Sequence, residues 1–165
     1  AHNCKNIVIT GGEPLIQDIK PLVQKLKNFH ITIETNCTLY KKELIPVVSF
    51  WSVSPKLKSS KQTYSKEALK KYIGLPAEKL QLKFVIADKN DFNELIDMLK
   101  KFPDIKKKQI LVVLQPEGLA ELIPYRKRCE DLVKLTFMSY KEIKDYNIRI
   151  LPQIHRFIWG NKRAV

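Results

Sequence analysis

Residues 6–15 read NIVITGGEPL, a short β-branched run that ends in two glycines, a glutamate and a proline. Runs of this kind, bounded by turn residues, are typical of buried strands. Because glycine has no side chain, Gly11 and Gly12 expose their backbone N–H and C=O groups to a ligand, and Glu13 is placed to bind an ammonium group. The same residues also suit an ordinary strand-to-helix turn, in which Glu13 favours the helix N-terminus and Pro14 takes the first helical position.

The rest of the chain continues this alternation of strand and helix. Its patterns predict strands at residues 6–10, 30–34, 50–54, 80–86, 109–114 and 147–150, and helices at 18–28, 64–72, 91–101 and 119–134. Residues 56–66 are rich in Lys and Ser and are predicted to form a loop. The alternation predicts one α/β domain over residues 1–165, with a parallel sheet that is covered by helices or rolled into part of a barrel.

Polar residues follow five of the predicted strands. They are Thr10-Gly11-Gly12-Glu13, Glu34-Thr35-Asn36, Ser54-Pro55-Lys56, Gln115-Pro116-Glu117-Gly118 and Pro152-Gln153-Ile154-His155. Each group taken alone is ordinary loop chemistry. Because the carboxyl ends of parallel strands meet at one edge of a sheet, we expect these residues to surround one crevice that binds a small polar ligand.

The basic composition is a weaker signal. A net charge of +13 is compatible with a nucleic-acid or membrane-surface partner, because Lys and Arg neutralise phosphates. However, five of the 30 basic residues are Arg, and the lysines are spread over predicted helix faces and loops. We therefore expect a solvated, Lys-rich surface rather than a dedicated nucleic-acid site, and we expect the run at residues 125–128 (YRKR) to be a solvated face as well.

The cysteines and the apolar runs indicate the cellular compartment in which the protein is expected. Cys4, Cys37 and Cys129 are far apart and form neither a disulfide framework nor a C-x-x-C metal motif, so they are expected to be buried or idle thiols unless they meet in space as cluster ligands. The apolar runs are strand-sized, well below the roughly 20 residues that a membrane span needs. The N-terminus has no signal-peptide pattern, and a cytoplasmic protein with no membrane partner is expected.

Several segments resemble a known enzyme family. Residues 8–15 (VITGGEPL) resemble the Gly-Gly-Glu motif with which radical S-adenosyl-L-methionine (SAM) enzymes bind the methionyl amino group of SAM. In order and type, the segments at 33–36 (IETN), 53–56 (VSPK), 82–85 (LKFV), 114–116 (LQP), 151–156 (LPQIHR) and 159–160 (WG) resemble the 7-carboxy-7-deazaguanine synthases. The resemblance covers almost the whole chain. The first motif marks only the superfamily, whereas its ordered combination with Ser-Pro-Lys and Pro-Gln-x-His is more selective.

The resemblance implies a partial (βα) barrel of the radical SAM type and a lyase of queuosine and 7-deazapurine biosynthesis. The family converts 6-carboxy-5,6,7,8-tetrahydropterin to 7-carboxy-7-deazaguanine with loss of ammonia, using SAM, a 4Fe-4S cluster and Mg²⁺. The cofactors supply the radical, and the protein supplies position and exclusion of solvent. The implied partners are the pterin substrate and an electron donor such as flavodoxin or ferredoxin, with no direct nucleic-acid contact.

The resemblance also implies roles for individual residues. The SAM-binding set is Gly11, Gly12, Glu13, Ser54, Pro55, Lys56, Gln115, Pro116, Glu117 and Gly118, and the substrate-binding set is Thr10, Asn36, Gln153 and His155. Lys56 suits a carboxylate of either ligand, or it is one more lysine in a lysine-rich loop. For His155 the alternative is a surface or core histidine without a ligand. Trp159 either stacks on the heterocycle or, more commonly for such a residue, packs in the core.

The chain departs from the family pattern at its start. The family binds its cluster through a Cys-x-x-x-Cys-x-x-Cys loop after the first strand, and no such spacing occurs here. The chain opens at Ala1 rather than Met, and the resemblance begins at the Gly-Gly-Glu strand. We therefore expect an N-terminally truncated barrel that is inactive by itself, with no catalytic residue and no metal ligand of its own. An exposed sheet edge would also favour a marginally stable or homodimeric protein.

Two single residues also depart from the pattern. Cys37 stands where the family more often has Gly, and it is expected to add bulk at the rim of the site. Ala164 stands where Gly commonly precedes the terminal Val, and it is expected to stiffen a tail that closes over substrate.

Other functions remain open at this point. Another radical SAM protein, such as an organic-radical activating enzyme, shares the Gly-Gly-Glu motif but does not account for Pro-Gln-x-His. A non-catalytic small-ligand or RNA-binding α/β domain would use the same crevice or the same basic surface. RNA binding should weaken steeply with salt, whereas binding in a small-ligand pocket should change much less.

Overall fold

Six parallel strands form one sheet in the computed structural model, which describes residues 4–118 and 122–160. The strands are β1 (Asn6–Ile9), β2 (His30–Thr35), β3 (Phe50–Val53), β4 (Leu80–Ile86), β5 (Leu111–Pro116) and β6 (Ile148–Ile150). They lie in the sheet in the order in which they occur in the chain, and each neighbouring pair is parallel. The predicted α/β class with a parallel sheet is therefore confirmed, and the open sheet fits part of a (βα) barrel.

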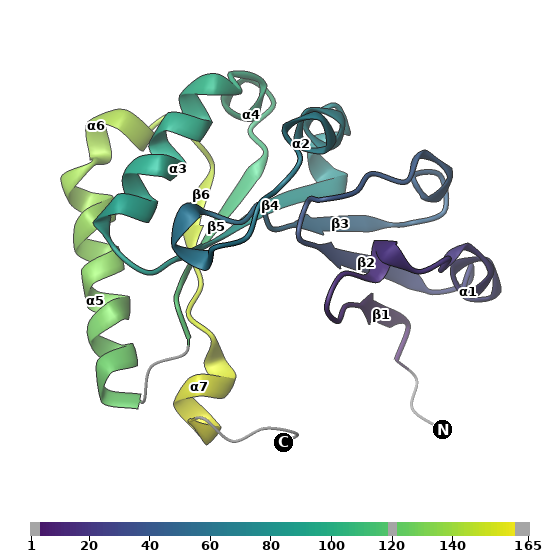
Figure 1. Ribbon diagram of the computed structural model, residues 1–165, viewed down its shortest axis with the longest axis horizontal. Helices are drawn as coiled ribbons and strands as arrows, with labels where there is room; N and C mark the ends of the chain where they lie inside the picture. Colours follow the sequence, from purple (N-terminus) through teal and green to yellow (C-terminus); the bar gives the residue numbers. More distant parts are fainter. Residues whose placement is uncertain (1–3, 119–121, 161–165) are drawn as a thin grey trace.

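Helices follow the strands. The α-helices are α1 (Lys20–Lys25), α2 (Lys66–Ile73), α3 (Lys89–Lys101), α4 (Asp104–Lys107), α5 (Leu122–Met138), α6 (Tyr140–Ile143) and α7 (Ile154–Trp159). Short 3-10 turns occur at η1 (Pro14–Ile16), η2 (Lys42–Leu44), η3 (Lys58–Ser60) and η4 (Ala77–Lys79). In Figure 1, helices α1, α2, α3, α5 and α6 surround the sheet at the top and sides, while α7 lies on the lower side.

The two faces of the sheet differ in polarity. In β4, the side chains of Leu80, Leu82, Phe84 and Ile86 are buried beneath the helices, whereas the alternate side chains are half-buried. The register places Glu34 opposite Ser52 and Ser52 opposite Gln81, so the alternate side chains of these strands share the other face, called here the inner face. Since successive side chains of a strand point to opposite sides, the sheet has an apolar outer face and a mixed polar inner face.

The element boundaries depart from prediction where single residues dominate. Strand β5 begins at Leu111 instead of residue 109, because Gln109 has a left-handed backbone (φ 55°) that closes the turn after α4. Helix α1 is shorter than predicted and has a proline in its first turn. Helix α3 begins at Lys89 because the Asp88 carboxylate accepts the backbone N–H groups of Asn90 and Asp91.

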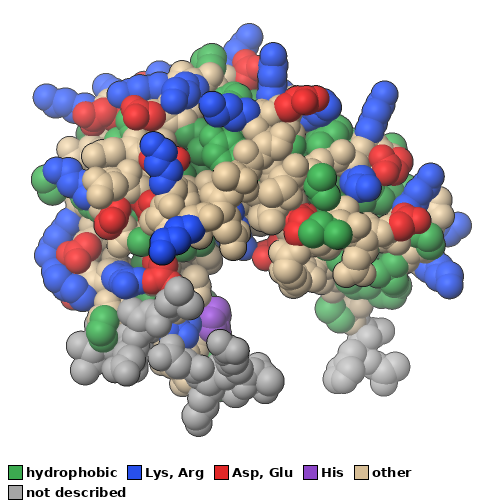
Figure 2. Space-filling view, viewed as in Figure 1, with side chains coloured by type: hydrophobic (Ala, Val, Ile, Leu, Met, Phe, Trp, Pro, Cys, Tyr) green, Lys and Arg blue, Asp and Glu red, His purple; other side chains and the backbone are tan. Residues whose placement is uncertain are grey.

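The outer surface carries most of the visible charge. Figure 2 shows Lys and Arg side chains spread along the outside of the molecule, and it shows the surface hollowed on the lower side. The spread agrees with the predicted solvated, Lys-rich surface. Strand β1 is an edge strand, and its Val8 side chain is 56% exposed. Within the described ranges, no helix is long and apolar enough to cross a bilayer.

Candidate functional site

The carboxyl ends of the strands meet around a polar cavity of about 360 Å³. Eight of the residues predicted for the site line it: Thr10, Gly11, Gly12, Asn36, Ser54, Lys56, Gln115 and Gln153. They come from the ends of β1, β2, β3 and β5 and from the segment after β6, so positions up to 143 residues apart in the sequence are brought together. The volume is within the usual range of small-ligand sites, about 300–1,000 Å³.

The Gly-Gly-Glu turn is held firmly by its own chain. Gly11 has φ +147°, a conformation that side-chain-bearing residues rarely adopt, and a Cβ added at Gly11 or Gly12 would meet no atom within 4 Å. Glu13 lies beneath the cavity at 8% exposure. Its Oε1 accepts the Leu15 N–H (3.1 Å) and the Thr35 hydroxyl (2.9 Å), and its Oε2 accepts the Asn36 N–H (2.6 Å). Glu13 also caps η1, with Pro14 in the first helical position, so the strand-to-helix turn is confirmed.

These three hydrogen bonds do not use the full accepting capacity of the Glu13 carboxylate. An ionised carboxylate accepts up to about four hydrogen bonds, so Glu13 retains capacity for a further donor. Thr35 and Asn36, which donate to Glu13, themselves line the cavity. Binding of the SAM ammonium group by Glu13 stays a prediction, and the geometry of the carboxylate permits it.

An ion pair on the inner face was not singled out from the sequence. The Lys83 ammonium lies 3.1 Å from Glu34 Oε2, and the Thr10 hydroxyl donates to the same oxygen at 3.4 Å. All three residues line the cavity. The signal that could have identified Lys83 is its place in β4, where Gln81 and Lys83 interrupt an apolar strand at every second position.

Lys56 lines the same cavity and is influenced by the charges of both carboxylates and of Lys83. Burial lowers the pKa of the Lys56 ammonium, and the positive charge of Lys83 lowers it further, whereas the carboxylates of Glu13 and Glu34 oppose these effects. The cavity therefore contains two ammonium groups and the Glu34 carboxylate, with the Glu13 carboxylate below it. Such a site suits a ligand that carries charges of both signs or several hydrogen-bonding groups.

A second cavity of about 490 Å³ adjoins the first, and both are lined by Ser54, Lys56, Gln62 and Val85. Pro55 and Glu117, two more predicted site residues, line this second cavity, as does Arg128. Arg128 forms an ion pair with the Glu117 carboxylate and donates to the Glu117 carbonyl oxygen at 3.4 Å.

The predicted solvated face at residues 125–128 is therefore partly wrong. Arg128 turns toward Glu117, and Tyr125 is fully buried with its ring 5.3 Å from that of Phe157. Arg126 and Lys127 are exposed, as predicted. The reason is helical periodicity, because positions three apart on α5 share the face that packs inward.

The comparisons with known proteins agree with these motifs, although no protein-family model matches the chain. A 7-carboxy-7-deazaguanine synthase of Bacillus cereus is 27% identical over 178 residues, which cover 99% of this chain and 70% of that protein. The synthase of Halobacterium salinarum is 29% identical over 97% of this chain and 67% of its own length. The synthase of Rickettsia prowazekii is 49% identical over 53 residues, which cover 31% of this chain.

Over almost its whole length, the chain is similar to the 7-carboxy-7-deazaguanine synthases. The predicted resemblance is confirmed, and it connects the chain with an enzyme family rather than with a structural or scaffolding protein. The matched region spans about 70% of the Bacillus cereus synthase.

The C-terminal motif is only partly brought to the cavity. Gln153 lines it, and the Gln153 N–H donates to the Tyr125 hydroxyl at 2.6 Å. A Cβ at Gly118 would lie 2.5 Å from Gln153 Oε1, so a side chain at residue 118 would require the Gln153 amide to shift. His155 lies exposed on α7 and does not line the cavity, and its predicted role stays a prediction. Trp159 is 43% exposed, so its interpretation as a core aromatic is wrong.

The remaining SAM-binding prediction, Pro116, is buried at the end of β5. It occupies a ladder position opposite Ile86 at the sheet's carboxyl edge. It does not line the first cavity.

The cysteines do not form a cluster site. Cys4 is exposed, Cys37 is buried and Cys129 is half-buried on α5. Among residues 4–118 and 122–160, no group of three or more His, Cys, Asp or Glu side chains gathers in a way that could hold a metal ion. An iron–sulfur cluster requires thiolate ligands, so this part of the chain does not supply them.

Cys37 differs from its predicted role. Its side chain is fully buried, with Sγ 3.9 Å from the Ser65 carbonyl oxygen, and it does not line the cavity, so the predicted bulk at the rim is wrong. Its backbone has φ 68°, a left-handed conformation that favours glycine and explains why the family more often has Gly here. Burial, assisted by the nearby Glu13 carboxylate, raises the pKa of the thiol to about 12. Ala164 lies outside the described residues.

Proposed function

We propose that the chain forms the SAM- and pterin-binding part of a 7-carboxy-7-deazaguanine synthase. One observation carries the proposal: the strand ends that bear the family's motifs meet around a single polar cavity. The reaction would be the conversion of 6-carboxy-5,6,7,8-tetrahydropterin to 7-carboxy-7-deazaguanine with loss of ammonia. When bound, SAM and the reduced cluster supply the 5′-deoxyadenosyl radical that begins this conversion.

The residues present suit SAM. Gly11 and Gly12 leave the backbone open to the methionyl end, and the Glu13 carboxylate has capacity for an ammonium donor. Lys56 offers a positive charge to a carboxylate at the junction of the two cavities. Ser54, Pro55 and Glu117 lie along the second cavity, where an adenosyl group has room to extend. Gln115 lines the first cavity, whereas Pro116 and Gly118 belong to the SAM assignment through the resemblance alone.

The substrate assignments use amide and hydroxyl groups. Thr10, Asn36 and Gln153 line the first cavity and supply the donors and acceptors that a planar heterocycle requires. The Lys83–Glu34 pair adds a charged group of each sign on the same wall.

Mg²⁺, an electron from flavodoxin or ferredoxin, and a homodimer belong to the proposal through the family alone. Their ligands and contact surfaces are not assigned to residues of this chain.

Binding and activity are tested separately. Calorimetric titration with SAM and fluorescence titration with 6-carboxypterin measure binding to the purified chain. For activity, the protein is expressed from the start codon of its own reading frame and reconstituted with iron and sulfide without oxygen. It is then assayed with the tetrahydropterin, SAM, dithionite and Mg²⁺. Formation of 7-carboxy-7-deazaguanine is expected, and a reconstituted protein that neither cleaves SAM nor forms this product would overturn the proposal.

A further inference from the structure

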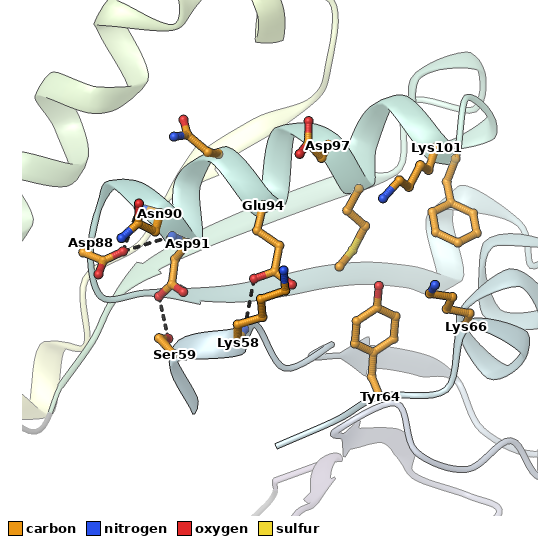
Figure 3. A pocket seen from close by; sticks show the side chains of 13 residues that line it. Lys58, Ser59, Tyr64, Lys66, Asp88, Asn90, Asp91, Glu94, Asp97 and Lys101 are labelled. Carbon is orange, nitrogen blue, oxygen red and sulfur yellow. Dashed lines mark hydrogen bonds between the residues drawn. The ribbon is translucent and has the colours of Figure 1, made fainter. Parts of the chain in front are cut away.

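The loop at residues 57–62 separates the functional site from a third cavity. On one side, Gln62 and Lys56, which directly precedes the loop, line both site cavities. Leu57, Ser59 and Ser60 of the loop line the second of them. On the other side, a cavity of about 990 Å³ lies between the loop and helix α3 and is lined by Lys58, Ser59 and residues of α3 (Figure 3). The loop therefore lies between the site and this third cavity, and its first residue, Leu57, is buried in the core.

Two hydrogen bonds join this loop to α3. The Ser59 hydroxyl donates to Asp91 Oδ2 at 2.7 Å, and the Lys58 N–H donates to Glu94 Oε2 at 3.0 Å. Figure 3 shows both bonds at the side of the cavity where the loop approaches the helix. Asp91 and Glu94 are three residues apart and so lie on one face of α3. The helix thus presents two carboxylates to consecutive residues of the loop.

Asp91 is a fixed acceptor. Its side chain is 2% exposed, and a buried carboxylate is costly unless it is hydrogen-bonded. The same Oδ2 also accepts the Ala87 N–H at 2.9 Å, and this bond ties the carboxylate to the chain just before the helix. The helix N-terminus further favours a negative charge at this position. Asp91 is therefore held by α3 whether or not the loop is in place.

Hydrogen bonds within the loop connect Ser59, the partner of Asp91, to the residues that line the site. Within the loop, the Ser60 hydroxyl donates to the Leu57 carbonyl oxygen at 2.6 Å, and the Gln62 N–H donates to Ser60 Oγ at 3.2 Å. Lys61 has a left-handed backbone (φ 55°), which closes the turn. Ser59 thus sits in the middle of a hydrogen-bonded turn whose two ends carry Lys56 and Gln62.

We propose that Asp91 is a positioning residue for the ligand site: through Ser59 it holds residues 57–62 in place and so sets the positions of Lys56 and Gln62. The proposal adds to the proposed function a residue that touches neither ligand. Helix capping alone would explain the Asp91–Ala87 bond, but it does not explain the bond to Ser59. Ser59→Ala separates these roles, because it removes the loop bond and leaves the capping bond intact.

The experiment compares Ser59→Ala with Ser59→Thr, which keeps the hydroxyl, and with Asn93→Ala, an exposed position of α3 that lines the same cavity. Amide exchange of residues 57–62 reports the loop directly. The pKa of Lys56 is measured by NMR of ¹³C-dimethylated lysines, with the signal assigned from Lys56→Arg. SAM affinity is measured by calorimetry. Thermal unfolding of every variant shows whether the fold is kept.

In Ser59→Ala we expect faster exchange in residues 57–62 and a rise in the pKa of Lys56 toward its ordinary value, because the released loop exposes the ammonium. We expect SAM affinity to fall by about five- to tenfold, which corresponds to about 1 to 1.4 kcal/mol. Ser59→Thr should restore all three readings, and Asn93→Ala should change none.

Unchanged exchange and an unchanged Lys56 pKa in a folded Ser59→Ala variant would overturn the positioning role. Wild-type protein that binds no SAM would instead contradict the proposed function. In that case the exchange and NMR readings still decide whether Asp91 positions the loop.

Discussion

The two ends of the site rim are built differently. At the β1–β2 end, Glu13 is buried and accepts hydrogen bonds from Leu15, Thr35 and Asn36. At the β6–α7 end, Leu151, His155 and Trp159 are exposed, and Gln153 is the predicted residue that reaches the cavity. Hydrogen bonds within the chain therefore hold the β1–β2 end, the first end, in place without a ligand. At the second end, the Gln153 N–H donates to the Tyr125 hydroxyl, but most of the side chains are exposed.

The largest expected effect is at Glu13. Glu13→Ala leaves the Leu15 N–H, the Asn36 N–H and the Thr35 hydroxyl without their buried acceptor. Each unsatisfied buried group costs about 1–3 kcal/mol, so we expect the free energy of unfolding to fall by about 3 kcal/mol or more. Urea denaturation measures this loss. Glu43→Ala, at an exposed glutamate of η2, is the control, and a Glu13→Ala variant as stable as that control would show that the first end is not preorganised.

The buried thiol of Cys37, which lies near Glu13 at the same end, should make the free energy of unfolding depend on pH. The folded-state pKa of about 12 lies above the thiol's ordinary 9.0, so the unfolded chain ionises first as pH rises. The stabilisation is complete below pH 9 and is lost progressively between pH 9 and 12, at up to about 1.4 kcal/mol per pH unit. Cys37→Ala should therefore flatten the decline in unfolding free energy over this range, while Cys4→Ala should leave it unchanged. Equal slopes in all three proteins would contradict the burial of this thiol.

A smaller effect is expected at Lys83, which lies on the inner face between the two ends. Lys83→Met removes the partner of Glu34 and one of the two causes that lower the pKa of Lys56. We expect the pKa of Lys56 to rise, as followed by NMR of methylated lysines. The pair is partly exposed, so the unfolding free energy should fall by about 1 kcal/mol or less. Lys79→Met, at an exposed lysine next to β4, is the control, and a Lys56 pKa that fails to rise would show that Lys83 does not act on it.

Much of the fold was predictable, because it depends on local patterns. The six predicted strands are present, since short apolar runs bounded by turn residues are a clear local signal of strands. The shared edge of Thr10, Ser54 and Gln115 followed from parallel pairing alone. Helix α7 was not predicted, because its six residues carry too little periodicity to distinguish it from a loop.

The contacts that complete the site were harder to predict because they depend on packing. Arg128 reaches Glu117 only once α5 lies against β5, and Lys83 reaches Glu34 only through the parallel register across β3. The Asp91–Ser59 bond likewise joins residues 32 positions apart. Spacing along the chain gives no sign of such pairs, whereas the polar interruptions within β4 gave a usable sign for Lys83.

The smallest expected effect is at His155 and tests the second end of the rim. His155→Ala should change the free energy of unfolding by no more than about 0.5 kcal/mol, because the side chain is exposed. Gln153→Ala is the matched variant, because this residue lines the cavity and lies only two positions earlier. In titrations with 6-carboxypterin, Gln153→Ala should weaken binding and His155→Ala should not. If His155→Ala weakens binding as much, α7 must move toward the cavity when the ligand binds. The second end would then be ordered by ligand rather than by its own chain.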